Sequence, residues 1–456
     1  MKASLYRNLI EPLYWKSKGL DVYKRYKEFA KCQWDSKDVF NRRQKIKIAN
    51  LLTHAFNITP YYKENNKYSK QELREKPIDV LHSLPIVDKE MLMNNMSRFY
   101  VDLGRGTYKN STGGSTGTPL IIMQDKVYLE ELIATTILTY EWAGKIPGDM
   151  HIKLWGAPRD LINNKRGYKQ ILFDLLFRRK TLNSFGMGPD TQRKYLNIIK
   201  NSKPKILEGY ADSLYEIAKA GERYNIDGGK PDAIVSSAGA LHDHMRAVVE
   251  SYFSSSVFDR YGSREAGNMA SECEYHNGLH IMGETTYIEV VDESGNHVNE
   301  GEEGRILVTK LNNYTMPLIR YEIGDMGILG GEKCACGRPY PILQKVIGRQ
   351  SGSFIRSDGG VVSPVFFIQC IGVYCNDGKV RSFQAIQDDI NKITFKLVPT
   401  DSLDVKNWPM ADKIVELVNS AMGAKCHITF EVVKEIAPTQ TGKHLYTVCN
   451  VSKFSY

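Results

Sequence analysis

Residues 110–123 of this chain read NSTGGSTGTPLIIM, a run of glycines and hydroxyl side chains followed by a short apolar stretch. The glycines let the backbone turn tightly and bring its N–H groups close to an anion, and the hydroxyls supply further donors. No lysine follows the last glycine, as a P-loop requires, and the Gly-x-Gly-x-x-Gly pattern of dinucleotide sites is absent. Taken alone, the run fits a flexible turn at least as well as a polyphosphate-binding loop.

The sequence on the C-terminal side of this loop alternates short apolar runs with helical patterns. Strands are predicted at residues 120–123, 205–210 and 233–237. Asp212 is placed to cap the helix after the second of them, and Leu241 to Phe253 form another amphipathic stripe. Strands that alternate with helices predict an α/β core whose loops at the sheet edge are available to ligands. On the N-terminal side, Asp38 to Phe56 shows helical spacing that ends before Pro60.

The pattern of predicted secondary structure changes twice in the second half of the chain. After Gly283 two alternating strands are predicted, over Thr286–Val291 and Arg305–Thr309. A further change near Gly348 is followed by strand, helix and strand patterns at 393–398, 414–421 and 427–433. We therefore expect an α/β domain over 1–348, with a β segment at 273–340, and a small α+β domain over 349–456.

Length and composition limit the classes of protein to which this chain can be assigned. A chain of 456 residues with 42% hydrophobic and 25% charged residues is expected to form two or more globular domains. The net charge of +9 is dispersed, which favours anionic small ligands over a nucleic acid. No apolar run approaches the roughly 20 residues that span a bilayer, and the N-terminus does not read as a secretory signal. The cysteines include a pair at 334 and 336 that suits a metal better than a disulfide, so a cytoplasmic location is expected.

Four further segments carry residues suited to nucleotide chemistry. Asp259–Glu265 follows a predicted strand, where Glu265 could hold Mg²⁺, and Pro317–Asp325 ends with an aspartate that could accept ribose hydroxyls. Gly348-Arg349 lies at the composition break, and Pro438–Lys443 puts a lysine on a short glycine turn. Each has a plain alternative on its own: a surface ion pair, a capped turn, a domain seam and an exposed lysine.

Taken together, the five segments resemble, in order and spacing, the adenylate-forming superfamily of acyl-CoA synthetases and related enzymes. The resemblance covers essentially the whole chain and is strongest to the phenylacetate–CoA ligase and coenzyme F390 synthetase group, particularly its capsule-polysaccharide-biosynthesis branch. It implies a large N-terminal adenylate-forming domain with a small mobile C-terminal lid. The residues that it assigns to ATP are Thr112, Ser115, Thr116, Gly239, Tyr261, Gly262, Asp325 and Arg349.

The resemblance also implies a reaction in two steps. A carboxylate attacks the α-phosphate of ATP and releases pyrophosphate, with Lys443 and the Glu265-bound Mg²⁺ offsetting the charge. The C-terminal domain then rotates about Arg349–Gln350, removes Lys443 and admits the acceptor. The acceptor is expected to be coenzyme A, and an amine such as an amino sugar is the alternative. This sequence departs from the family pattern at Ala240 and Gln350, where an acidic residue and a hinge acid or lysine are usual.

A separate set of cysteines and histidines predicts a structural zinc site. Cys273, His280, Cys334 and Cys336 provide three thiolates and one imidazole, which suit a closed tetrahedral site. His276 competes with His280 as the fourth ligand, and buried free cysteines are the alternative to a metal site. Similar segments in the phenylacetate–CoA ligase group favour zinc.

Two other classes of function compete with this interpretation. A nucleotidyltransferase would also use glycine-rich loops, but it would not need a lysine in a separate C-terminal lid. A non-catalytic protein that binds a nucleotide or zinc is the second alternative. The identity of the acid cannot be read from the sequence, and homodimers are common among the proteins that it resembles.

Overall fold

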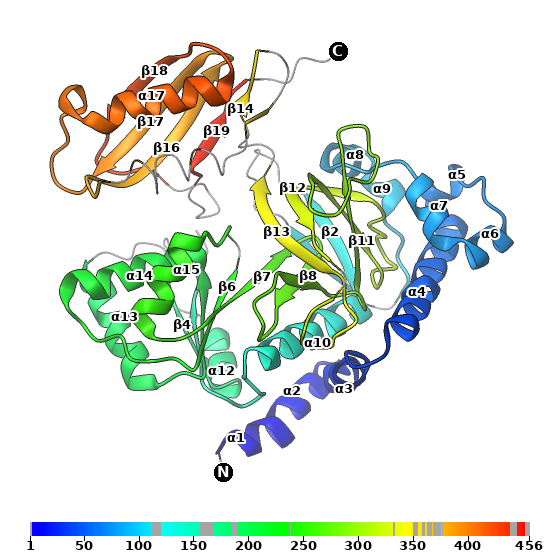
Figure 1. Ribbon diagram of the computed structural model, residues 1–456. Helices are drawn as coiled ribbons and strands as arrows, with labels where there is room; N and C mark the ends of the chain where they lie inside the picture. Colours follow the sequence, from blue (N-terminus) through cyan, green and yellow to red (C-terminus); the bar gives the residue numbers. More distant parts are fainter. Residues whose placement is uncertain are drawn as a thin grey trace. The chain divides into compact units, whose positions relative to one another are not determined.

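The computed structural model describes residues 2–104, 106–111, 120–155, 168–184, 189–237, 239–331, 333–349, 354–357, 361–362, 367, 375, 377–437 and 445–451. It divides into two compact units (Figure 1). The first comprises Met1–Ile323 and Gly327–Val346, and the second Gly324–Met326 and Ile347–Tyr456. Among the described residues, no helix has the length and apolar character that a membrane span requires.

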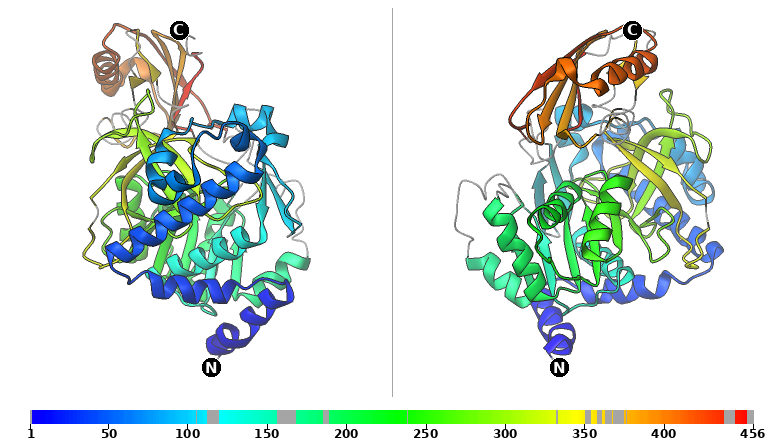
Figure 2. Two further views of the ribbon diagram at one scale, coloured as in Figure 1. Left: turned by 90° about the vertical axis from the view of Figure 1, so that its right-hand side faces the viewer. Right: turned by 60° about the vertical axis from the view of Figure 1, so that its left-hand side comes forward.

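The first unit begins with a helical layer. A π-helical turn at Tyr6–Ile10 interrupts the first helix. The helices are α1 (Lys2–Leu5), α2 (Glu11–Ser17), α3 (Val22–Cys32), α4 (Lys37–Ile58), α5 (Pro60–Glu64), α6 (Lys70–Glu75), α7 (Pro77–Ser83), α8 (Lys89–Asn94) and α9 (Met96–Phe99). A further helix, α10 (Lys126–Trp142), lies along α3 (Figure 2).

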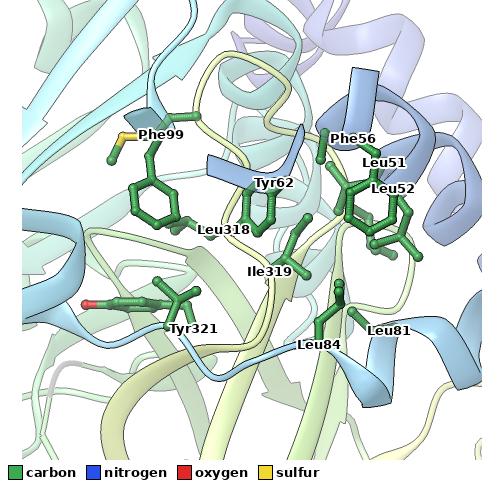
Figure 3. Close-up of a cluster of buried hydrophobic side chains, with 14 of the residues drawn as sticks. Leu51, Leu52, Phe56, Tyr62, Leu81, Leu84, Phe99, Leu318, Ile319 and Tyr321 are labelled. Carbon is green, nitrogen blue, oxygen red and sulfur yellow. The ribbon is translucent and has the colours of Figure 1, made fainter. Parts of the chain in front are cut away.

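Helix α4 confirms the predicted amphipathic helix. Ser36 caps it by accepting a hydrogen bond from the backbone N–H of Val39, and it ends at Ile58, two residues before Pro60. Its buried stripe, which includes Leu51, Leu52 and Phe56, packs with residues of the neighbouring helices and of the segment 318–321 (Figure 3). This cluster fastens the helical layer to the sheet.

An eleven-stranded sheet forms the centre of the first unit, in the order β10-β11-β12-β13-β9-β8-β7-β6-β5-β3-β4. The strands β4, β3, β5, β6 and β7 run parallel, and β8 and β9 continue antiparallel. The bounds are β3 (His151–Leu154), β4 (Arg179–Leu182), β5 (Ile206–Tyr210), β6 (Ala233–Ser237), β7 (Val257–Ser263), β8 (Gly267–Glu272), β9 (Leu279–Ile281), β10 (Thr286–Val291), β11 (Glu303–Lys310), β12 (Tyr321–Leu329) and β13 (Ile342–Arg349). A separate hairpin pairs β1 (Thr107–Ser111) with β2 (Ile121–Asp125).

Helices cover both faces of the parallel strands, as is usual for parallel sheets. The helices between and after the parallel strands are α12 (Tyr168–Leu176), α13 (Pro189–Ser202), α14 (Ala211–Tyr224) and α15 (Asp243–Phe253). Helices α13, α14 and α15 share one core with β3, β5 and β6. Tyr140 of α10 reaches the other face, where it bonds to Glu208 of β5. The predicted α/β architecture is therefore confirmed.

Three local expectations from the sequence were wrong. Asp212 does not occupy the N-cap position, because α14 begins at Ala211 and its N-cap residue is Tyr210. Residues Asp259 to Ser263 belong to β7 itself rather than following a strand. Asp325 lies within β12, although Gly324 before it has a φ of +80°. In the last two cases, pairing with neighbouring strands extends the sheet through residues with turn-like composition.

Over its described residues, the second unit contains a four-stranded sheet in the order β18-β17-β16-β19, an α-helix and a small hairpin. Its elements are β14 (Phe354–Ile355), β15 (Val361–Val362), β16 (Val380–Asp389), β17 (Lys392–Pro399), a 3₁₀ turn (Val405–Asn407), α17 (Pro409–Met422), β18 (His427–Val432) and β19 (Thr447–Cys449). Ile414 and Val418 of α17 pack with Phe395 of β17 in its own core. The predicted small α+β C-terminal domain is confirmed.

Candidate functional site

The hairpin β1–β2 leads into and out of the glycine-rich loop. Thr112, Ser115 and Thr116 lie outside the described residues, whereas both strands beside them are described. Asn110 of β1 and Gln124 of β2 each donate a side-chain hydrogen bond, 3.1 Å long, to the backbone carbonyl of Arg264. The base of the loop is therefore fixed to the turn between β7 and β8. The sequence placed Asn110 in the loop motif and gave no role to Gln124.

The β7–β8 turn carries Glu265, and its geometry requires a glycine on each side. A Cβ on Gly262 would lie 2.7 Å from the carbonyl oxygen of Gly267, and Gly267 itself has a φ of +69°. The backbone N–H of Ala266 donates to Oγ of Ser263 at 3.0 Å. The Tyr128 hydroxyl of α10 lies 3.4 Å from the carbonyl oxygen of Glu265. Glu265 is thus held, half-buried, on a constrained turn beside the base of the loop.

The parallel strands bring further residues, among them the predicted Gly239 and Tyr261, to the same edge of the sheet. Gly239 follows β6, and Ser237 of β6 pairs with Arg260 of β7, one residue before Tyr261. Trp155 follows β3 and Tyr210 ends β5; their rings pack with centroids 4.3 Å apart. Because all these positions are at the carboxyl ends of parallel strands, they line the edge where ligands bind in open α/β sheets.

A network of buried charges, which the sequence interpretation missed, lies in the strands behind this edge. Glu208 of β5 is fully buried and lies 3.2 Å from the Lys153 ammonium and 3.0 Å from Nε2 of His151. It also pairs with Arg260 and accepts a hydrogen bond of 2.7 Å from Tyr140. Burial alone would raise the pKa of Glu208, but Lys153, Arg260 and His151 together lower it well below its usual value.

The sequence pattern around these charged residues could have indicated the network. Lys153 lies between Ile152 and Leu154, and Glu208 follows two apolar residues in its strand. The two strands pair in register at Lys153 and Glu208. Lys153 also lies over the ring of Trp155, 4.1 Å from its centroid. The network therefore fixes the side chains that lead to the sheet edge.

The remaining nucleotide-site predictions fall in or next to the second unit. Asp325 lies in β12 within the short segment grouped with that unit, and Arg349 is the last residue of β13. Lys443 and Gln350 lie outside the described residues.

The predicted zinc ligands come together in the first unit. One ligand atom each from Cys273, His280, Cys334 and Cys336 lies within 4.8 Å of the others. The sulfurs of Cys273 and Cys334 are 3.7 Å apart, and Sγ of Cys336 is 3.3 Å from Nε2 of His280. A tetrahedral zinc ion with Zn–S bonds of about 2.3 Å has sulfur atoms about 3.8 Å apart. The arrangement therefore fits a tetrahedral ion with little movement.

The backbone around this cluster is also suited to thiolates. The N–H of Tyr275 lies 3.5 Å from Sγ of Cys273, and the N–H of Arg338 lies 3.5 Å from Sγ of Cys336. Burial lowers the pKa of His280 to about 4, which keeps the imidazole neutral as a metal ligand must be. The alternative ligand His276 instead places Nδ1 3.1 Å from a carboxylate oxygen of Glu272.

Comparison with known proteins finds that the chain is similar to proteins of the CapK and phenylacetate-coenzyme A ligase type. A family model described as the CapK C-terminal domain matches residues 354–450. The chain is 25% identical to Protein CapK of Staphylococcus aureus over 408 residues, which cover 86% of each protein. It is 23% identical to a phenylacetate-coenzyme A ligase of Thermus thermophilus over 333 residues, 68% of this chain and 71% of that enzyme.

The fold agrees with these sequence matches. The crystal structure of 2-hydroxyisobutyryl-CoA ligase in the postadenylation state superposes with a TM-score of 0.69 at 15% identity. The match covers 90% of this chain and 89% of that one. The resemblance expected from the five sequence motifs is therefore confirmed in sequence and in fold.

Proposed function

We propose that this chain is an AMP-forming acid–thiol ligase, because it is similar in sequence to Protein CapK and to phenylacetate-coenzyme A ligases and in fold to 2-hydroxyisobutyryl-CoA ligase. It would use ATP to convert a carboxylic acid to its acyl-adenylate, release pyrophosphate and transfer the acyl group to coenzyme A. One observation carries this proposal. The base of the glycine-rich loop, the turn with Glu265 and the Gly239 and Tyr261 segments meet at one edge of the parallel sheet.

Each of these segments has a distinct task in the proposed first step. The backbone and hydroxyls of Thr112, Ser115 and Thr116 would hold the β- and γ-phosphates. Glu265 would ligate Mg²⁺, which neutralises phosphate charge when bound, and the hydrogen bonds to Arg264 set the distance between the Glu265 turn and the loop.

Further residues would hold the nucleoside. Tyr261, Gly262 and Gly239 would contact the adenine, where glycine allows close approach. Asp325 would accept the ribose hydroxyls, and Arg349 would contact the ribose from the hinge side. The acyl group would pack against the wall formed by Trp155 and Tyr210.

Lys443 would act on the transferring group itself. Its ammonium would offset the negative charge that develops as the carboxylate attacks the α-phosphate. We propose that the C-terminal unit, from about residue 349, then rotates and withdraws this lysine before the acceptor enters. If so, Lys443→Ala should impair adenylation far more than thioester formation from a supplied acyl-adenylate, and equal loss of both steps would contradict the rotation.

The decisive experiment measures pyrophosphate release with ATP and Mg²⁺ over a panel of aryl, fatty, hydroxy and amino acids. We expect release with one class of acid and a loss of at least about 10²-fold in Lys443→Ala and in Glu265→Gln. Coenzyme A and amino sugars are then offered as acceptors to the preformed acyl-adenylate. Failure to bind ATP would refute the proposal, whereas an acylated amine would identify an amide ligase. A role in surface polysaccharide biosynthesis stays a prediction, which an amino-sugar acceptor would support.

We also propose that Cys273, His280, Cys334 and Cys336 hold a structural zinc ion. The cluster packs against Phe29, Trp142 and other buried side chains. With all four positions filled by protein, no position is left for substrate, so the ion would link the loop before β13 to β8 and β9. We expect one tightly held zinc ion here, lost in Cys334→Ser with a lower melting temperature. A metal-free protein that melts at the same temperature would refute the site.

A further inference from the structure

A second group of metal-binding side chains lies in the first unit, away from the cysteine cluster in sequence. His82 of α7, Glu289 of β10 and His297, in the segment between β10 and β11, each offer a ligand atom within 4.8 Å of the other two. The rings of His82 and His297 meet edge to face, with centroids 4.1 Å apart. All three residues belong to one compact unit, so no movement between units affects this arrangement.

Neighbouring groups hold each of the three side chains in place. The Tyr287 hydroxyl, on the same face of β10 as Glu289, lies 3.0 Å from Nε2 of His82. Nε2 of His297 lies 2.9 Å from Oε1 of Glu289. A bridge between Val291 and His297 fixes the backbone of the turn. The side chains are therefore oriented before any ion arrives, which lowers the cost of binding one.

The two oxygens of the Glu289 carboxylate differ in their contacts. Oε1 accepts from Arg320 at 3.1 Å and lies beside His297. Glu289 is only 2% exposed, and within the described part of the chain Oε2 has no hydrogen-bond partner. A buried carboxylate oxygen without a partner is costly, and a cation is one group that satisfies it.

Arg320 pairs with only one oxygen of the Glu289 carboxylate. Its guanidinium donates to the carbonyls of His82 and Leu84 at 2.7 and 2.6 Å, so its charge is shared with the end of α7. It occupies Oε1 only and leaves Oε2 available. Because His297 has 42% of its side chain exposed, an ion can reach the site from solvent.

We propose that His82, Glu289 and His297 bind a divalent transition-metal ion of the zinc type. Two imidazoles and one carboxylate are a common ligand set for such ions, and a water molecule would complete four-fold coordination. Two ligand atoms of one ion lie at most about 4.4 Å apart, since each bond is about 2.0–2.2 Å long. Small side-chain adjustments therefore close the site. The ion would fasten α7 to the β10–β11 hairpin, and the site does not depend on the proposed ligase activity.

Metal titration of the whole chain tests this proposal. Protein saturated with Zn²⁺ at the cysteine cluster is titrated with Co²⁺, followed by absorption and by metal analysis after desalting. We expect one additional ion per chain, with a visible cobalt spectrum that lacks the near-ultraviolet thiolate charge-transfer band. His297→Ala should lose this ion, whereas His427→Ala, an exposed histidine on β18, should keep it.

Melting in the absence and presence of excess metal provides a second measurement. His297→Ala should melt like the wild type without metal, because this exposed side chain contributes little to the fold. Added metal should then raise the melting temperature of the wild type and of His427→Ala but not of His297→Ala. Equal metal content and equal response in wild type and His297→Ala would overturn the proposal, as would a cobalt spectrum that arises only from thiolates.

Discussion

The buried charges around Glu208 give the sharpest test of how this fold is stabilised. Glu208 is fully buried and pairs with Arg260, which is always charged, and with Lys153, which is charged only when protonated. We predict that Glu208→Gln, which keeps the shape and removes the charge, destabilises the first unit by about 3–5 kcal/mol. That is a large share of the roughly 5–15 kcal/mol that stabilises a typical domain.

The two cations respond differently to the loss of the carboxylate. Burial lowers the pKa of Lys153 even with Glu208 present, so this lysine can lose its proton when the carboxylate is removed. Arg260 is largely shielded from solvent, cannot be deprotonated and would be left as an unpaired charge. The cost of Glu208→Gln should therefore come mainly from Arg260. The double variant Glu208→Gln/Arg260→Met should recover about 2 kcal/mol or more, because it removes the stranded charge.

Urea denaturation followed by tryptophan fluorescence measures these changes, since Lys153 of the network lies over the ring of Trp155. The matched control is Glu222→Gln, which breaks an exposed pair with Lys219 and should cost less than about 1 kcal/mol. A double variant no more stable than Glu208→Gln alone would refute the reasoning. So would a loss for Glu208→Gln as small as that of the surface control.

Other consequences follow from burial, backbone geometry and titration. Leu52→Ala, at a fully buried position, should cost about 2–5 kcal/mol in denaturation, while Ile46→Ala on the exposed face of the same helix should cost less than about 1 kcal/mol. Gly267→Ala should lower the free energy of unfolding by about 1–3 kcal/mol and reduce pyrophosphate release, because φ is +69° and the new Cβ would lie within 3 Å of its neighbours. The control Gly301→Ala has a φ of +85° but open space around the new Cβ, so it should destabilise the protein less and leave activity intact. Burial lowers the pKa of His242 from 6.5 to about 4, so between these pH values the unfolded chain binds a proton more readily than the folded chain. The free energy of unfolding should therefore fall by up to about 3 kcal/mol as the pH drops from 6.5 to 4. His242→Gln should flatten this pH dependence, and an unchanged profile in the variant would contradict the prediction.

The sequence predicted the strands and helices well where a single physical pattern controlled them. Thr286–Val291 and Ala233–Ser237 were predicted residue for residue, because alternation and continuous apolar runs are direct signals of strands. The errors arose where tertiary pairing overrode local composition. Asp259–Ser263 was expected to follow a strand but belongs to β7, and Asp325 belongs to β12; both strands pair with their neighbours. Glu265 does lie on a turn at the end of a strand, as expected.

The two metal clusters illustrate what spacing can and cannot reveal. Cys334 and Cys336 are two residues apart, and Cys273 and His280 are seven apart, so short-range spacing indicated ligands before the fold was known. His82 is more than two hundred residues from Glu289 in sequence, and nothing near it suggests a metal. Only the packing of α7 against the β10–β11 hairpin, held by Arg320, brings these side chains together.

Arg320 itself connects the second cluster with a predicted nucleotide segment. It lies in Pro317–Asp325, adopts a φ of +49° and bonds the carbonyls of His82 and Leu84. A non-glycine residue in this conformation costs about 1 kcal/mol or more and persists only where surrounding contacts hold it. Those contacts come from α7 and Glu289, so an ion bound there would also stiffen the start of β12, four residues before Asp325. If this connection holds, filling the second metal site should protect the amides of residues 321–323 from hydrogen exchange in wild type but not in His297→Ala.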